Sequence, residues 1–204
     1  LGANTIFSTR IWIDQFKIQE KYQSQAPEIL QNTMPVMLCP ARPRRGNVSI
    51  SESKGPVGAI GDYAGNAGTP RFFPFDVWAK FKDPVDGVFN SGLASQNPVV
   101  NGKLAGTERG RYGHAEITDG LSNTIFIGEK YVSTHGELKS QGWGDGSIYN
   151  GDEPETFMRI GGFAMGLAAS RTLILSPGEY PIFGSGHVGV VNFAFGDGSV
   201  HSLP

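Results

Sequence analysis

The sequence has little of the chemistry by which many domains are classified. Among its 204 residues there is a single cysteine, so no disulfide can form within this chain. Charged residues make up 18%, and the net charge of -2 comes without a basic stripe, which argues against nucleic-acid binding. The chain lacks an apolar run of about 18 residues, so no segment of it is predicted to span a membrane.

Familiar catalytic signatures are also absent. The sequence has no CxxC, HExxH, GxSxG or phosphate-loop motif. It begins at Leu1 rather than at a methionine, which is typical of a processed or trimmed protein. The 29 glycines and 13 prolines make up about a fifth of the chain and favour turns and irregular loops over long helices.

The remaining pattern predicts one α+β domain over residues 1–204, with an N-terminal helical segment packed on an antiparallel β-sheet. Helices are expected over residues 11–22 and 28–32. Strands or extended segments are expected over residues 36–40, 58–69, 123–132 and 190–203. Long loop insertions are expected at about residues 41–57, 90–110 and 133–176.

The C-terminal stretch predicts a β-hairpin within the central sheet. Alternation places Val191, Phe193 and Phe195 on one face. Asp197-Gly198 suits a two-residue primed turn, because both residue types tolerate positive φ. In that register Phe195 lies opposite Val200, and Ala194 lies opposite His201.

His187 and Asp197 frame this hairpin. Ten residues of extended chain separate them by roughly 30 Å, so they cannot share one metal ion or one proton unless the chain bends back. We therefore interpret Asp197, with Gly198, as a turn former, and His187 as a hydrogen-bonding residue that leads into the strand.

Glu129 occupies an unusual position in the strand predicted before the hairpin. Alternation places it on the same face as Ile125 and Ile127, and a carboxylate on an apolar face needs a partner. It could be a general acid or base, or it could accept hydrogen bonds from backbone amides. Pairing with an arginine such as Arg111 or Arg71 is a further alternative, and we favour a structural pairing.

An acidic loop offers candidate binding residues. Asp145, Asp152 and Glu153 are oxygen donors of the kind that Ca²⁺ prefers, although their spacing differs from that of an EF-hand, and a solvated acidic loop is the favoured interpretation. Trp143 and Tyr149 lie beside them, as they would in a sugar-binding loop, although aromatic residues in loops more often pack locally.

Five stretches together resemble one protein family. They are Met37–Pro40, Gly61–Gly65, Asp86–Phe89, Ile117–Glu129 (which includes Asp119 and Gly120) and His187–Val200. In order and spread they are similar to the prepilin-type, processing-associated H-x9-DG domain family, a family of unknown function found mostly in planctomycete bacteria.

The resemblance implies a pseudopilin-like head displayed outside the cytoplasmic membrane, in the periplasm or at the cell surface. Full-length members of that family carry a leader and a long apolar helix, which would lie upstream of Leu1 and provide the contact with the membrane and with other pilin-like subunits. The resemblance also implies that Cys39 could pair with an upstream cysteine. Major pseudopilins bind Ca²⁺ in a C-terminal loop, and the family has no established catalytic residues.

Two functional hypotheses follow. The first is a non-enzymatic pilin- or pseudopilin-like subunit of a cell-envelope filament or a type II secretion-like apparatus. The alternative is a secreted carbohydrate-binding or glycoside-active domain, with a site formed by Trp143, Asp145, Tyr149 and Glu129.

Overall fold

The structure of the chain is a computed structural model. It describes residues 22, 24–42, 46–49, 56–69, 87–89, 99–100, 103–104, 113–132, 146–150, 154–161, 166–168 and 182–204.

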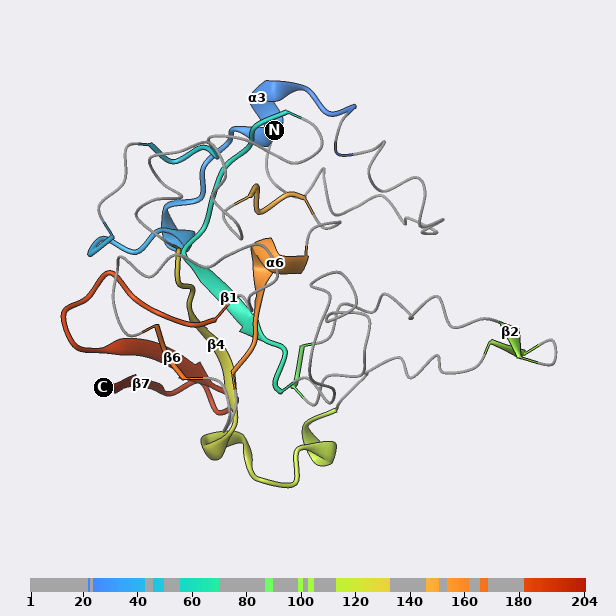
Figure 1. The fold of residues 1–204 in the computed structure, drawn as a ribbon, viewed down its shortest axis with the longest axis vertical. Coiled ribbons are helices and arrows are strands. Elements are labelled where there is room, and N and C mark those ends of the chain that lie inside the picture. The colour runs from blue at the N-terminus through green and yellow to red at the C-terminus, as the bar shows by residue number, and fades with distance from the viewer. Residues whose placement is uncertain are drawn as a thin grey trace.

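A mixed sheet of five strands, in the order β5-β1-β4-β6-β7, forms the centre of the described part (Figure 1). The strands are β1 (Tyr63–Asn66), β4 (Ile125–Glu129), β5 (Met158–Arg159), β6 (Val191–Phe195) and β7 (Val200–Leu203). Neighbouring strands are antiparallel except β1 and β5, which are parallel. A separate two-stranded ribbon joins β2 (Val99–Val100) and β3 (Lys103–Leu104).

Helices in the described part are short. They are α3 (Pro27–Leu30), α6 (Pro154–Phe157) and the 3-10 turns η1 (Pro35–Met37), η2 (His114–Glu116) and η3 (Leu121–Asn123). The mixed sheet with few helices agrees with an α+β class, although the parallel β1–β5 pair differs from the predicted antiparallel sheet. The helix predicted over residues 11–22 lies outside the described residues, apart from Tyr22. None of the described helices is both long and apolar enough to cross a membrane.

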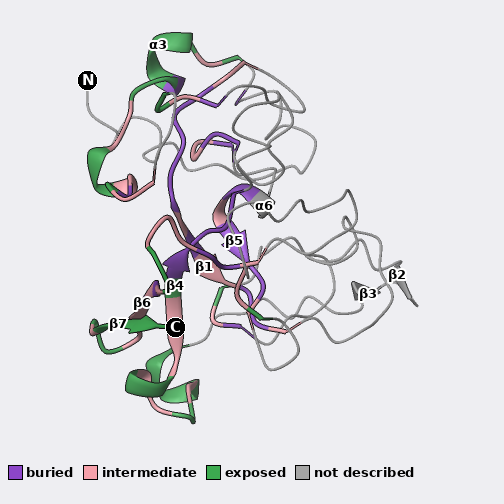
Figure 2. Ribbon diagram, turned by 60° about the vertical axis from the view of Figure 1, so that its left-hand side comes forward, coloured by how far each residue is buried: buried purple, intermediate pink, exposed green. Residues whose placement is uncertain are grey.

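Apolar side chains pack on one face of β6. Phe183, Val191 and Phe193 form a buried cluster. The Phe183 and Phe193 rings pack edge to face, with their centroids 5.3 Å apart. Gly128 makes this packing possible, because a Cβ at that position would lie 2.5 Å from the Phe193 ring. Figure 2 shows buried chain at β5 and at the end of β4, whereas β7 is exposed.

The terminal hairpin belongs to the central sheet, as predicted, but its register differs from the prediction by one residue. Ala194 pairs with Val200, and Phe193 pairs with His201. The loop has three residues rather than two, because the Gly198 N–H bonds to the Phe195 carbonyl and the Phe195 N–H bonds to the Ser199 carbonyl. Gly198, with φ +85°, takes the left-handed position that such a loop requires.

A β-bulge in β4 overturns the predicted alternation in that strand. Ile125 pairs with Phe195 and Gly128 with Phe193, and the register shifts between Ile125 and Ile127. Since paired residues share a face, Ile125 and Gly128 lie on the apolar face of β6, three positions apart. Ile127 and Glu129 therefore lie on the opposite face, so Glu129 does not share a face with Ile125 as predicted.

Other predicted elements also differ. The strand expected over residues 36–40 is instead the 3-10 turn η1, an extended Leu38 and a second turn at Pro40, because Pro35 suits the first position of a helical turn. The segment expected over residues 58–69 contains β1. The long loop expected over residues 133–176 contains α6 and β5, which had no clear periodicity because they are only a few residues long.

Candidate functional site

Three side chains from distant parts of the sequence converge beside the sheet. The Cys39 Sγ lies 3.2 Å from Glu129 Oε1 and 3.5 Å from His187 Nε2. The His187 Nε2 lies 3.3 Å from the same Glu129 oxygen. We call this group the Cys–Glu–His cluster, and each of its members is a residue type that binds metals.

Cys39 reaches the cluster from the segment that follows η1. Its backbone N–H donates a hydrogen bond to Asp62 Oδ2, and the other oxygen of that carboxylate accepts a bond of 2.7 Å from Arg42 Nη1. The Asp62 N–H in turn donates to the Met37 carbonyl. Asp62 thus joins the Cys39 segment to the chain just before β1, and the Arg42–Asp62 ion pair is almost wholly buried.

Glu129 enters the cluster at the end of β4, on the face to which the bulge turns it. It is 2% exposed, and its Oε2 accepts a hydrogen bond of 2.8 Å from the Asn192 N–H in β6. This bond fixes the carboxylate so that Oε1 faces Cys39 and His187. A buried carboxylate needs such partners, because an ionised group without them is costly in a protein interior.

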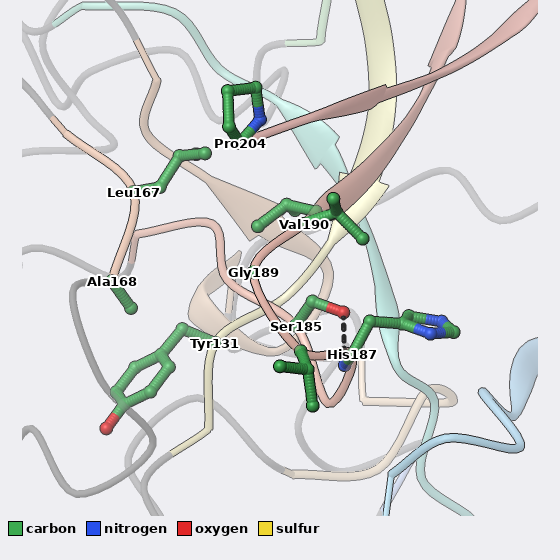
Figure 3. Close-up of a pocket in the computed structure, with 10 residues that line it drawn as sticks. Tyr131, Leu167, Ala168, Ser185, His187, Gly189, Val190 and Pro204 are labelled. Carbon is green, nitrogen blue, oxygen red and sulfur yellow. Dashed lines mark hydrogen bonds between the residues drawn. The ribbon is translucent and has the colours of Figure 1, made fainter.

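His187 lies in the loop before β6, and its backbone N–H donates a hydrogen bond of 3.0 Å to Ser185 Oγ. The side chain is 35% exposed, whereas those of Cys39 and Glu129 are buried. The same loop borders an open cleft of about 610 Å³ that Tyr131, Leu167, Ala168 and the C-terminal Pro204 also line. His187 itself also lines this cleft, and in Figure 3 its ring points away from Tyr131, Leu167 and Ala168.

The chemistry of the cluster differs from that of a cysteine nucleophile. Burial raises the pKa of the Cys39 thiol, and the hydrogen bond that it donates to Glu129 raises this pKa further. An activated cysteine needs the opposite shift, which a positive neighbour or a helix N-terminus supplies. Without a cation, the thiol stays protonated at neutral pH and acts as a hydrogen-bond donor.

The structure places His187 and Asp197 with different partners. Asp197 Oδ1 accepts hydrogen bonds from the Ser199 N–H and hydroxyl at 2.9 and 2.7 Å. These bonds lower the pKa of the Asp197 carboxyl below its usual range. Asp197 is thus bonded within its own turn, whereas His187 faces Glu129 and Cys39.

Asp119 and Gly120 lie near the turn end of the hairpin, away from the cluster. The Asp119 carbonyl accepts a bond from the Asn123 side chain, and Gly120 has φ +86°. This turn leads into Thr124, whose carbonyl accepts a bond of 3.0 Å from the Gly196 N–H. The Asp-Gly pairs of two motif stretches therefore lie on segments that hydrogen-bond to each other.

Of the candidate calcium and sugar residues, only Glu129 and Tyr149 lie within the described part of the chain, and of these two Glu129 belongs to the cluster. Trp143, Asp145, Asp152 and Glu153 lie outside the described residues. Tyr149 donates a hydrogen bond of 2.8 Å to the Asn32 carbonyl just after α3, and burial raises the pKa of its phenol. Calcium and sugar binding stay predictions.

Sequence reasoning considered Cys39, Glu129 and His187 separately and missed their convergence. Arg111 and Arg71, the arginines suggested as partners of Glu129, lie outside the described residues. The observed partners are a thiol, an imidazole and a backbone amide. The only signal in the sequence was that all three side chains, and Asp62 as well, stand in stretches that carry the family resemblance.

The fold and the site together define a class of protein: a small mixed-sheet domain in which three segments distant in the sequence meet at a largely buried Cys–Glu–His cluster. The chain matches, over residues 7–204, a family described as "Protein of unknown function (DUF1559)", and it belongs to that family. No curated protein and no solved structure matches it.

Proposed function

We propose that this chain is the head of a non-enzymatic pilin- or pseudopilin-like subunit of a cell-envelope filament or a type II secretion-like apparatus. It would lie outside the cytoplasmic membrane and join other subunits through a helix upstream of Leu1. The proposal starts from the resemblance to the H-x9-DG family, whose full-length members have a pilin-like architecture.

The observation that carries the proposal is that residues in the stretches resembling the family hold separate segments of the fold together. Cys39, Asp62 and Glu129 are buried, and their polar atoms bond to one another's segments and to backbone amides. Residues that bind a substrate would instead present free polar atoms to a cleft. Buried ties between segments suit a rigid head that must keep its shape within an assembly.

The carbohydrate alternative has no comparable support among the described residues. The Glu129 carboxylate is 2% exposed and its two oxygens face Cys39, His187 and the Asn192 amide. A glycosidase would need an accessible carboxyl at the site of cleavage.

The proposal is tested on the full-length gene product in its native host. We expect an epitope-tagged chain to be shortened at its N-terminus and to sediment with sheared surface filaments or envelope complexes. In a strain without prepilin peptidase, the longer precursor should stay in the membrane and the assembled fraction should be lost.

A periplasmic reporter with an ordinary secretory signal serves as the control, because its processing should be the same in both strains. A tagged chain of identical mass in both strains, or one recovered from the cytoplasm, would contradict the proposal.

A further inference from the structure

The Cys–Glu–His cluster has the dimensions of a metal site. Zinc binds sulfur at about 2.3 Å and imidazole nitrogen or carboxylate oxygen at about 2.0–2.2 Å, so a tetrahedral site separates neighbouring ligand atoms by about 3.4–3.6 Å. The three pairs in the cluster are 3.2, 3.3 and 3.5 Å apart. We propose that Cys39, Glu129 and His187 bind one divalent transition-metal ion, with Zn²⁺ as the representative.

The ligand set selects the class of ion. A thiolate is a poor ligand for Ca²⁺ or Mg²⁺, which take hard oxygen donors, whereas sulfur, nitrogen and oxygen together suit Zn²⁺. A thiolate and a carboxylate carry two negative charges, which a divalent ion neutralises. The metal would therefore remove the cost of two ionised groups in a site where Cys39 and Glu129 are buried.

Contacts behind the three ligands already hold them in place. The Asn192 N–H bonds to the Glu129 oxygen that faces away from the cluster, and Asp62 holds the Cys39 backbone. Ser185 holds the backbone of His187. Such outer contacts orient metal ligands before the ion arrives and reduce the rearrangement that binding requires.

The fourth ligand would come from solvent. His187 is the one member of the cluster with a partly exposed side chain, so water reaches the ion from its side. The ion would tie the segment after η1, the end of β4 and the loop before β6 together. A metal-bound Cys39 thiolate cannot also be in a disulfide, so metal binding competes with the cysteine pairing that the resemblance implies.

The first test uses the unaltered chain, freed of metal with a chelator and titrated with Co²⁺. Cys39 is the single cysteine, so a thiolate-to-cobalt charge-transfer band reports this residue alone. We expect the band to saturate at one equivalent and to disappear when Zn²⁺ displaces Co²⁺. A chain that binds neither ion, or cobalt binding without that band, would overturn the proposal and leave a hydrogen-bonded cluster.

The second test compares variants by calorimetric titration with Zn²⁺. Cys39→Ser and His187→Gln should each weaken binding by more than roughly 100-fold, beyond the 10–100-fold typical of outer contacts. His114→Gln is the matched control, because His114 is exposed on η2 and should bind Zn²⁺ as the unaltered chain does.

Circular dichroism confirms that each variant is folded. His187→Gln is the more tolerant substitution, because its side chain is partly exposed. Undiminished one-to-one binding by a folded His187→Gln chain would remove the imidazole from the site and overturn the assignment.

Discussion

The two ends of the β6–β7 hairpin carry residues of one sequence motif, yet their contacts differ in kind. At the start, His187 meets Glu129 and Cys39, which are 58 and 148 residues away from it in the sequence (187 − 129 and 187 − 39). At the turn, Asp197 bonds only two residues ahead, to Ser199. The first end makes long-range contacts with two buried residues, and the second makes local hydrogen bonds in a solvent-exposed turn.

This difference teaches that one motif can combine two physical roles. A buried network leaves several groups without partners when one member is removed, and that desolvation cost is large. A substitution in an exposed turn lowers the free energy of unfolding only slightly, because water replaces the missing hydrogen bonds. Substitutions at the two ends should therefore separate clearly in their effect on stability.

The largest effect is expected for Asp62→Ala, which removes the carboxylate shared by Arg42 and the Cys39 amide. Breaking one side of a buried ion pair typically costs about 3–5 kcal/mol in the free energy of unfolding. Urea denaturation followed by circular dichroism measures the change. Asp119→Ala, at an exposed aspartate in another motif stretch, is the matched control and should change stability by less than about 0.5 kcal/mol.

The double variant Arg42→Ala/Asp62→Ala sharpens this measurement. Asp62→Ala leaves the Arg42 cation buried without this partner, and Arg42→Ala removes that cation. The loss of stability in the double variant should therefore be smaller than the sum of the losses in the two single variants. Additive losses, or an Asp62→Ala chain as stable as the Asp119→Ala control, would show that Asp62 does not hold the Cys39 segment of the long-range network.

A smaller effect is expected for Glu129→Gln. The amide oxygen can still accept from the Asn192 N–H, but the amide NH₂ cannot accept the Cys39 thiol hydrogen. We expect a loss of about 1–3 kcal/mol, measured by urea denaturation without added metal. Glu28→Gln, at an exposed glutamate of α3, is the control. Equal urea midpoints for the two variants would show that the buried Glu129 carboxylate does not contribute to stability.

The smallest effect is expected for Asp197→Ala at the turn, and it should depend on pH. The Ser199 hydrogen bonds lower the pKa of the folded Asp197 carboxyl, so its contribution is full above the usual aspartate range. It is lost as the pH falls through the lowered pKa. The melting temperatures of the unaltered and Asp197→Ala chains should therefore differ slightly at neutral pH and converge in strong acid. A gap that widens in acid would contradict the assignment.

Sequence patterns predicted the parts of the fold that depend on neighbours along the chain. Alternation at Val191, Phe193 and Phe195 predicted β6 and its apolar face, and the Asp197-Gly198 pair predicted the hairpin. The one-residue register error arose because three loop residues, rather than two, satisfy the backbone bonds of Phe195. Turn length depends on which hydrogen bonds close, and composition alone leaves that choice open.

Long-range placement could not be predicted in the same way. Strict alternation assigned Glu129 to the face of Ile125, but a bulge turned it to the other face. A bulge forms where pairing with a distant strand favours an extra residue, so a single strand's sequence carries little trace of it. The partners of Glu129 could only be found once the segment after η1 and the loop before β6 had been placed beside β4.

By itself, the sequence determined which features its composition excludes, such as a disulfide within this chain. It also determined the strand that begins near Val191 and the glycine turn at Gly198. These follow from local physics, namely side-chain alternation and the backbone angles that glycine allows. Only the tertiary structure decided that Cys39, Glu129 and His187 meet. Their meeting depends on the packing of three segments that are distant in the sequence, and that packing is set by the whole sheet rather than by any one stretch.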